Sequence, residues 1–254
     1  MIIDIHVHHS WHSPARQRPN ATVGRYQEHA LRNDIRKIVL LTLAYDCPPA
    51  QTRERNSATL QLQHADPHFF VAALGLNPLH DEDFIRSETK RCVQEGARAI
   101  KLHMSLNARD HRHDLICQLA AEHGIPIIMH SWYKMANKYP NESDGSDLAY
   151  MARRNPQTKI VAAHLTGLQR RGVLDLADIP NAYIDTSGCL PENDLVEYAV
   201  RYMGSERMLF GSDYPGRCYE MQVGRVLDAE ITEEQKQDIL WRNAASMLGL
   251  GETI

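Results

Sequence analysis

The chain has 254 residues, of which 43% are hydrophobic and 24% charged, and its net charge is −4 with histidine counted as neutral. These are the proportions of an ordinary globular protein, and without a basic stretch they argue against a nucleic-acid or anionic-membrane surface. No run approaches the roughly 18 apolar residues of a membrane-spanning helix, and no signal peptide is recognisable. Five scattered cysteines without a C-x-x-C pair predict reduced thiols and a cytoplasmic location.

The chain begins with MIIDIHVHHSW, in which Asp4, His6 and His8 occupy every second position. Side chains alternate between the two faces of a strand, so this spacing predicts that all three point to one face. The apolar residues between them would then pack on the other face. The histidine face must look into a polar cavity or toward a metal.

Eight apolar segments have the pattern of buried strands, and they cover residues 1–7, 37–43, 69–74, 97–103, 125–130, 159–164, 182–185 and 207–210. Runs such as IVLLTL and IPIIM are apolar on both faces, as in parallel strands covered on both sides. Helical spacing lies between them, for example before Gly124 and after the capping box of Thr232 and Gln235.

Eight such units without a composition break predict an α/β fold, a (β/α)₈ TIM barrel that forms a single domain over residues 1–254. A doubly wound open sheet is the alternative. It would normally carry a glycine-rich loop after the first strand, which VHHSWHS is not. The segment 131–147 is long enough to act as a lid over the strand ends.

Polar residues gather at the carboxyl ends of the predicted strands, which meet at one face of a parallel barrel. They are His6, His8, Lys101, His103, His130, His164 and Asp213. Imidazole and carboxylate ligands suit Zn²⁺, and also Mn²⁺ or Fe²⁺. The lack of a nearby cysteine favours a catalytic centre with an open coordination position over a closed structural site.

The motifs DIHVH, IPIIMH, IVAAHLTG, LFGSDYP and RNAASMLGL, in this order over residues 2–250, resemble the amidohydrolase superfamily. The resemblance is to its amidohydrolase-related branch, which includes aminocarboxymuconate-semialdehyde decarboxylase. It implies that His6, His8, His130 and Asp213 bind one divalent metal, with Zn²⁺ expected first and Mn²⁺ or Fe²⁺ as alternatives. It also implies that His164 stands beside the metal-bound water as a proton-transfer and orienting group.

A bound Zn²⁺ lowers the pKa of its water from near 16 to about 7, so Asp213 could take that proton and deliver it to a leaving group. The expected function is therefore a metal-dependent hydrolase of a small-molecule amide, ester or lactone. The alternative is a metal-dependent decarboxylase of an aromatic or unsaturated carboxylic acid. A phosphoesterase of the polymerase-and-histidinol-phosphatase type is disfavoured by the late motif Ser212–Asp213–Tyr214. A metal-binding protein without turnover is the non-enzyme hypothesis.

Lys101 has the same strand parity as His103, and both should point into the barrel. Lys101 could pair with Asp4 or Asp185, bind a substrate carboxylate, or carry a carboxyl group that bridges two metals. Substrate binding is favoured for Lys101 and His103.

Three residues that follow ligand strands, Trp11, Tyr214 and Arg217, are expected to line the same pocket. The expected partner is a small-molecule substrate, with neither nucleic acid nor membrane, and a homodimer is left open.

Overall fold

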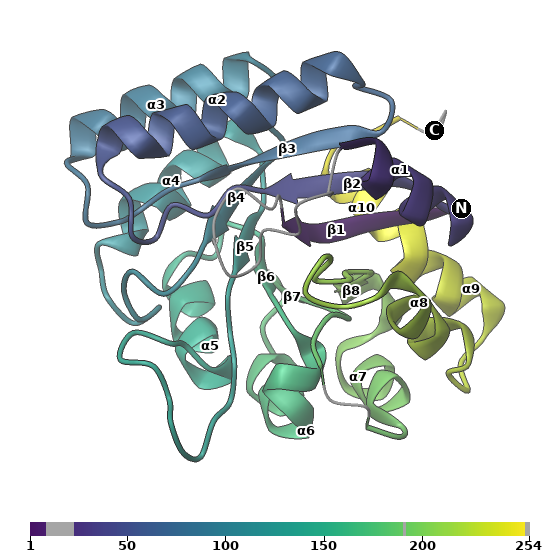
Figure 1. Ribbon diagram of the computed structural model, residues 1–254. Coiled ribbons are helices and arrows are strands. Elements are labelled where there is room, and N and C mark those ends of the chain that lie inside the picture. The colour runs from purple at the N-terminus through teal and green to yellow at the C-terminus, as the bar shows by residue number, and fades with distance from the viewer. Residues whose placement is uncertain (9–22, 190–191, 252–254) are drawn as a thin grey trace.

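The structure is a computed structural model that describes residues 1–8, 23–189 and 192–251. Eight parallel strands form one sheet in the order of the chain, from β1 to β8 (Figure 1). The strands are β1 (Ile2–His8), β2 (Ile35–Leu41), β3 (Phe70–Gly75), β4 (Ala99–Leu102), β5 (Ile127–Met129), β6 (Ile160–Ala162), β7 (Ala182–Asp185) and β8 (Met208–Leu209). Each of the eight predicted segments contains or overlaps a strand, so the predicted (β/α)₈ barrel is confirmed.

Helices alternate with the strands and surround them (Figure 1). The helices are α1 (Val23–Arg32), α2 (Pro49–Ala65), α3 (Glu82–Gln94), α4 (His113–His123), α5 (Gly145–Arg154), α6 (Leu165–Leu176), α7 (Leu195–Met203), α8 (Tyr219–Leu227), α9 (Glu233–Gln237) and α10 (Asn243–Met247), with a short 3₁₀ turn η2 (Ser205–Arg207) and a π-helical turn η3 (Asp238–Arg242). The predicted capping box at Thr232 and Gln235 is present, and Gly124 ends α4 in the left-handed conformation at φ 66°.

The segment around and after β8 closes the sheet onto β1. The N–H of Ile5 donates to the carbonyl oxygen of Phe210 at 3.0 Å, and the N–H of Asp213 donates to that of His6 at 2.8 Å. The end of the barrel at the carboxyl ends of the strands, called the mouth below, is thereby complete around β1, β8 and β7.

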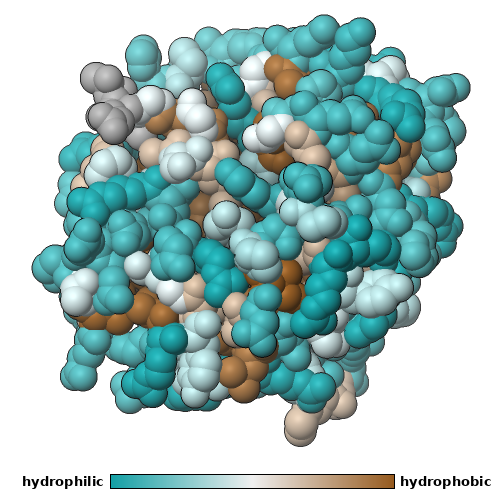
Figure 2. Space-filling view, turned by 180° about the vertical axis from the view of Figure 1, so that it is seen from behind, coloured by the Kyte–Doolittle hydropathy of each residue, from teal (hydrophilic) through white to brown (hydrophobic). Residues whose placement is uncertain are grey.

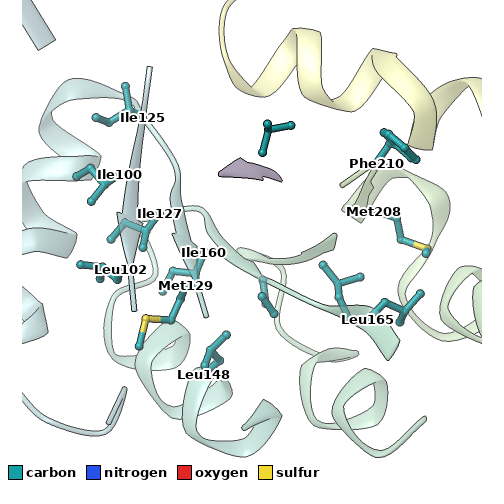
Figure 3. Close-up of a cluster of buried hydrophobic side chains, with 14 of the residues drawn as sticks. Ile100, Leu102, Ile125, Ile127, Met129, Leu148, Ile160, Leu165, Met208 and Phe210 are labelled. Carbon is teal, nitrogen blue, oxygen red and sulfur yellow. The ribbon is translucent and has the colours of Figure 1, made fainter. Parts of the chain in front are cut away.

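Two apolar layers hold the barrel together. One lies between the sheet and the helices and contains Ile100, Ile127 and Ile160 of the strands together with Leu148 of α5 and Leu165 of α6 (Figure 3). The other fills the barrel interior and contains Ile3, Ile5, Val39, Leu41, Val71, Ala73, Ile128, Val161 and Leu209, with Ala244, Met247 and Leu248 from the C-terminal segment. This interior layer supports the residues of the mouth from below.

The surface seen in Figure 2 is mainly hydrophilic, with small apolar patches scattered over it. Within the described ranges, none of the helices combines the length and the apolar character that crossing a membrane requires.

Candidate metal centre and active site

A β-bulge in β1 sets the direction of its side chains. Three residue steps from Asp4 to Val7 on β1 match only two on β2, so one residue is extra. A bulge interrupts the regular alternation of a strand. Asp4 pairs with Ile38, which packs toward the helices, whereas His6 and His8 face each other in the mouth. The prediction that Asp4 shares a face with the two histidines is therefore wrong.

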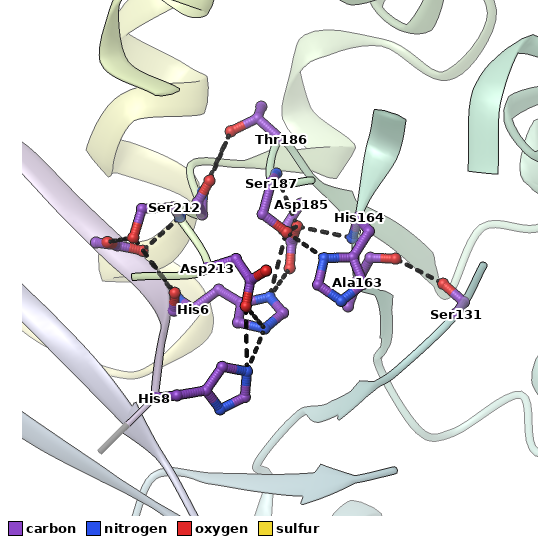
Figure 4. A network of polar contacts seen from close by, with 12 residues as sticks. His6, His8, Ser131, Ala163, His164, Asp185, Thr186, Ser187, Ser212 and Asp213 are labelled. Carbon is purple, nitrogen blue, oxygen red and sulfur yellow. Dashed lines mark hydrogen bonds and ion pairs between the residues drawn. The ribbon is translucent and has the colours of Figure 1, made fainter. Parts of the chain in front are cut away.

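His6, His8 and Asp213 bring three donor atoms together (Figure 4). The Nε2 atoms of the two imidazoles lie 3.1 Å apart. Oδ1 of Asp213 lies 3.4 Å from Nε2 of His8 and 3.8 Å from Nε2 of His6. Two ring nitrogens from β1 and one carboxylate oxygen from the segment after β8 thus converge on one point.

The electrostatics of this cluster suit a cation. Burial lowers the pKa of His8 to about 4, against the raising effect of Asp213, so its ring is neutral at pH 7. Burial by itself would raise the pKa of Asp213, but the hydrogen bond with His8 and the rings of His164 and His6 hold it well below its usual range. A neutral imidazole from His8 and a negatively charged carboxylate from Asp213 are donor types that Zn²⁺ and Mn²⁺ accept.

His164 and Asp213 both have left-handed backbone conformations, at φ 73° and φ 60°. Such a conformation costs on the order of 1–3 kcal/mol in a residue other than glycine, and surrounding contacts must hold it. The N–H of His164 donates to Oδ1 of Asp185 at 2.9 Å, and the N–H of Asp213 donates to the carbonyl oxygen of His6. Strain is thus located at two predicted proton-transfer groups and held by other residues of the mouth.

Asp185 and Ser187, at the end of β7, connect two of the histidines (Figure 4). Oδ2 of Asp185 lies 2.7 Å from Nδ1 of His6, and Oγ of Ser187 lies 2.9 Å from Nδ1 of His164. Sequence reasoning considered Asp185 only as a partner for Lys101 and did not single out Ser187. One feature of the sequence could have pointed to Asp185 as a site residue, because it lies at the end of a predicted strand like the other predicted site residues.

His130 lies beside this cluster. Its ring centroid is 5.1 Å from that of His164, but its Nε2 faces Oε1 of Glu142 at 3.2 Å. Nζ of Lys134 approaches the same oxygen at 2.9 Å, which ties the segment between β5 and α5 to the mouth. His130 does not join the described groups of converging donor atoms, so its role as a metal ligand stays a prediction. Glu142 was not foreseen.

Lys101 and His103 point into the barrel from β4 and the residue after it. Lys101 is 1% exposed, and its Nζ has no hydrogen-bond partner in the part of the chain that the structure describes. Burial lowers its pKa to about 8, although the charges of Asp185 and Asp213 act against this shift. The ring of His103 lies between Tyr45, at 4.6 Å, and His130, at 4.5 Å. The substrate-binding roles of Lys101 and His103 stay predictions.

Tyr214 does not lie at the donor cluster. Its ring stacks on Tyr219 at 4.3 Å and meets Tyr26 edge-on at 5.1 Å, between α8 and α1. β8 ends at Leu209 and the left-handed residue Asp213 lies between it and Tyr214, so Tyr214 does not follow the strand alternation. This placement supports packing and not the expected lining of the pocket.

Of the other two residues expected to line the pocket, Arg217 stays beside Asp213, because its N–H donates to the carbonyl oxygen of that residue at 3.2 Å. Its role in substrate binding stays a prediction. Trp11 lies outside the described residues.

Several known proteins resemble this chain. One match in sequence is with 2-amino-3-carboxymuconate-6-semialdehyde decarboxylase of Caenorhabditis elegans, 30% identical over 71 residues. That match covers 27% of this chain and spans only 18% of the length of the relative.

Among solved structures, 5-carboxyvanillate decarboxylase from Sphingomonas paucimobilis has a TM-score of 0.80 at 16% identity, covering 98% of this chain and 99% of that one. For 2,6-dihydroxybenzoate decarboxylase from Rhizobium the TM-score is 0.78 at 15% identity, with 98% of both chains covered. A dihydroxybenzoic acid decarboxylase from Polaromonas sp. JS666, solved with bound manganese, also has a TM-score of 0.78, at 16% identity, covering 98% of this chain and 97% of that one. At these identities the likeness establishes the barrel fold.

The four relatives named above are decarboxylases, and this overturns the expectation of a hydrolase in favour of the alternative reading. The manganese in one of them also shows that zinc is not the only metal of this fold group. The family itself follows from a wider match, because the family model described as Amidohydrolase covers residues 3–250. The chain therefore belongs to the amidohydrolase family.

Proposed function

We propose that the protein is a metal-dependent decarboxylase of an aromatic or unsaturated carboxylic acid. The relatives named above support this reaction class. The observation that carries the proposal is the buried ammonium group of Lys101, which has no hydrogen-bond partner among the described residues and lies under the influence of Asp185 and Asp213. A buried cation without a partner is costly, and an anionic substrate would supply the partner.

The residues present fit a divalent cation. Nε2 of His6, Nε2 of His8 and Oδ1 of Asp213 would hold it, and the other ring nitrogen of His6 already contacts a carboxylate oxygen. Metal-binding histidines almost always have such a partner on their second nitrogen. A divalent cation bound there would supply Lewis acidity toward substrate oxygens. Zn²⁺ and Mn²⁺ both suit this donor set, and we propose one such ion per chain.

The reaction breaks one C–C bond, leaves its electron pair on the substrate carbon and places a proton there. In this proposal Lys101 binds an anionic oxygen of the acid and neutralises part of its charge. Asp213 and His164 hold and move the proton, since both lie at the mouth. Burial keeps the pKa of His164 well below its ordinary value, so its neutral ring can take up a proton from solvent and pass it to the substrate carbon that loses CO₂.

The test is turnover of 2,6-dihydroxybenzoate and 5-carboxyvanillate with a ¹³C-labelled carboxyl group. We expect labelled CO₂ and the decarboxylated product in equal amounts, loss of both after chelation, and recovery with Mn²⁺ or Zn²⁺. His164→Asn should lower the rate by about 10²- to 10⁴-fold, the usual contribution of a general acid or base, while the metal content is retained. Turnover of an ester or lactone panel without any CO₂ release from these acids would overturn the proposal.

A further inference from the structure

Asp185 and Ser187 are both fully buried, and their contacts form one continuous path between His6 and His164. Oδ1 of Asp185 accepts from the N–H groups of His164 and Ser187, both at 2.9 Å, and from Oγ of Ser187 at 2.5 Å. Oδ2 accepts from Nδ1 of His6 at 2.7 Å. Two backbone N–H groups and a hydroxyl donating to one oxygen stabilise the ionised carboxylate, which can only accept, so Oδ2 accepts from Nδ1 of His6.

The position of each proton follows from this arrangement. Ser187 has a single hydroxyl hydrogen, and its short contact with the carboxylate of Asp185 uses it. Its oxygen must therefore accept at the contact with His164, so Nδ1 of His164 carries a hydrogen. Nδ1 of His6 likewise carries the hydrogen that Oδ2 of Asp185 accepts.

We propose that Asp185 and Ser187 are positioning residues that hold His6 and His164 as Nδ1–H tautomers. Nε2 of His6 then offers a lone pair to the donor cluster, and Nε2 of His164 faces the reaction as a proton acceptor. One carboxylate would thus prepare a metal ligand directly and a proton-transfer group through a hydroxyl. The chemical use of these tautomers rests on the proposed function, whereas the tautomers themselves do not.

The backbone next to this path is built for close approach. A Cβ at Gly211 would lie 3.0 Å from Cβ of His6 and 3.0 Å from Cγ of Asp185, closer than ordinary contacts. The absence of a side chain at Gly211 therefore lets the segment after β8 pack directly against the pair formed by His6 and Asp185.

The donor atoms of His6, His164 and Asp185 also lie within 4.8 Å of one another, a spacing that could hold a second ion. In our proposal hydrogen bonds through Ser187 occupy this space instead. A second ion at this place would give two metal ions per chain, whereas our proposal expects one.

The direct test is ¹⁵N NMR of the histidine rings in metal-free protein at pH 8, with signals assigned by substitution. We expect Nδ1–H signatures for both His6 and His164 in the wild type. Ser187→Ala should change the signature of His164 alone, whereas Asp185→Asn should change both. Glu88→Gln, which alters another fully buried and hydrogen-bonded carboxylate on α3, is the matched control and should change neither.

The second measurement is the affinity for Mn²⁺ and Zn²⁺ by competition with a chelator. Asp185→Asn should weaken binding by about 10- to 100-fold, as expected for a partner of a metal ligand, and Ser187→Ala by less than about 3-fold. An unchanged His164 signature in Ser187→Ala, or two ions per chain in the wild type, would overturn the proposal. Because the NMR test uses no metal and no substrate, its result is independent of whether CO₂ is released. If Asp185→Asn does not fold, Ser187→Ala still decides the assignment of His164.

Discussion

The two sides of the mouth differ in how completely their polar groups are partnered. On the side of β1, β7 and β8, His6 and Asp213 lie in a connected set of contacts with Asp185 and Ser187, although Nδ1 of His8 has no hydrogen-bond partner among the described residues. On the side of β4, the Nζ of Lys101 and the Nδ1 of His103 are buried without a hydrogen-bond partner in the described ranges. Buried polar groups are usually hydrogen-bonded, so a group left unpartnered needs an explanation.

This difference suggests a division of labour. The partnered side is prepared in advance to hold an ion and to orient imidazoles. The unpartnered side has donors whose partner would come with the substrate. Substitutions on the first side should therefore act on the metal, and substitutions on the second side should act on the substrate.

Asp213→Asn tests the partnered side and should have the largest effect. Replacing the only carboxylate of the cluster should lower metal content after dialysis, and decarboxylation should fall by at least about 100-fold. Asp194→Asn is the matched control, because Asp194 is also left-handed, at φ 63°, but lies at the start of α7. Full metal content in Asp213→Asn would contradict the assignment of the cluster.

Lys101→Met tests the unpartnered side. We expect the KM for the acid to rise by about 10-fold or more while metal content is unchanged, since one cationic contact with the substrate is lost. Lys37→Met is the control: Lys37 is also buried, but its Nζ donates to the carbonyl oxygen of Pro67 at 3.3 Å and to that of His68 at 2.5 Å. Urea unfolding at pH 7 should show Lys37→Met destabilised by about 1–3 kcal/mol and Lys101→Met not destabilised.

The same pair of proteins gives a pH test. Burial lowers the pKa of Lys101 to about 8 from an ordinary value of 10.5, so between these values the unfolded chain binds more protons than the folded one. Wild-type stability should then rise with pH relative to Lys101→Met, by on the order of 3 kcal/mol across this window. The difference should be constant below about pH 8. If the difference in unfolding free energy between wild type and Lys101→Met did not change from pH 7 to 11, the buried ammonium group of Lys101 would have a partner.

Glu142→Gln should have the smallest effect. It removes a charge close to the mouth but leaves the residues of its partnered side and of its unpartnered side in place. Burial by itself would raise the pKa of Glu142, but the contacts with His130 and Lys134 outweigh this effect, and the pKa lies below its ordinary value. The carboxylate therefore stabilises the fold above about pH 4.5, and this contribution is lost as the pH falls through its lowered pKa. We expect a loss of about 1–2 kcal/mol at pH 7 that disappears in acid, measured by urea unfolding. Glu122→Gln, at an exposed position of α4, should show no such loss.

The barrel and part of the site could be predicted from the sequence. Runs of apolar residues on both faces give strong strand signals, and parallel topology brings strand ends together. His8 and Asp213 could therefore be expected to meet although they are 205 positions apart in the chain. The capping box at Thr232 was visible for a similar reason, because it depends only on local spacing.

Other features depend on contacts that spacing does not encode. The bulge at β1 leaves the apolar alternation of the sequence intact, and so the outward direction of Asp4 was hidden. Asp185 and Ser187 resemble ordinary polar residues at the end of a strand, and only the approach of His6 and His164 gives them a role. Glu142 reaches His130 from a long connection whose path the sequence does not specify.

The apolar residues that fill the barrel beneath the histidines have a consequence for how substrate and product would move. Ile3, Ile5 and Val39 fill the barrel below the mouth with buried apolar side chains, and Met247 and Leu248 belong to the same cluster. If the proposed reaction is correct, the acid would have to enter, and CO₂ would have to leave, at the mouth.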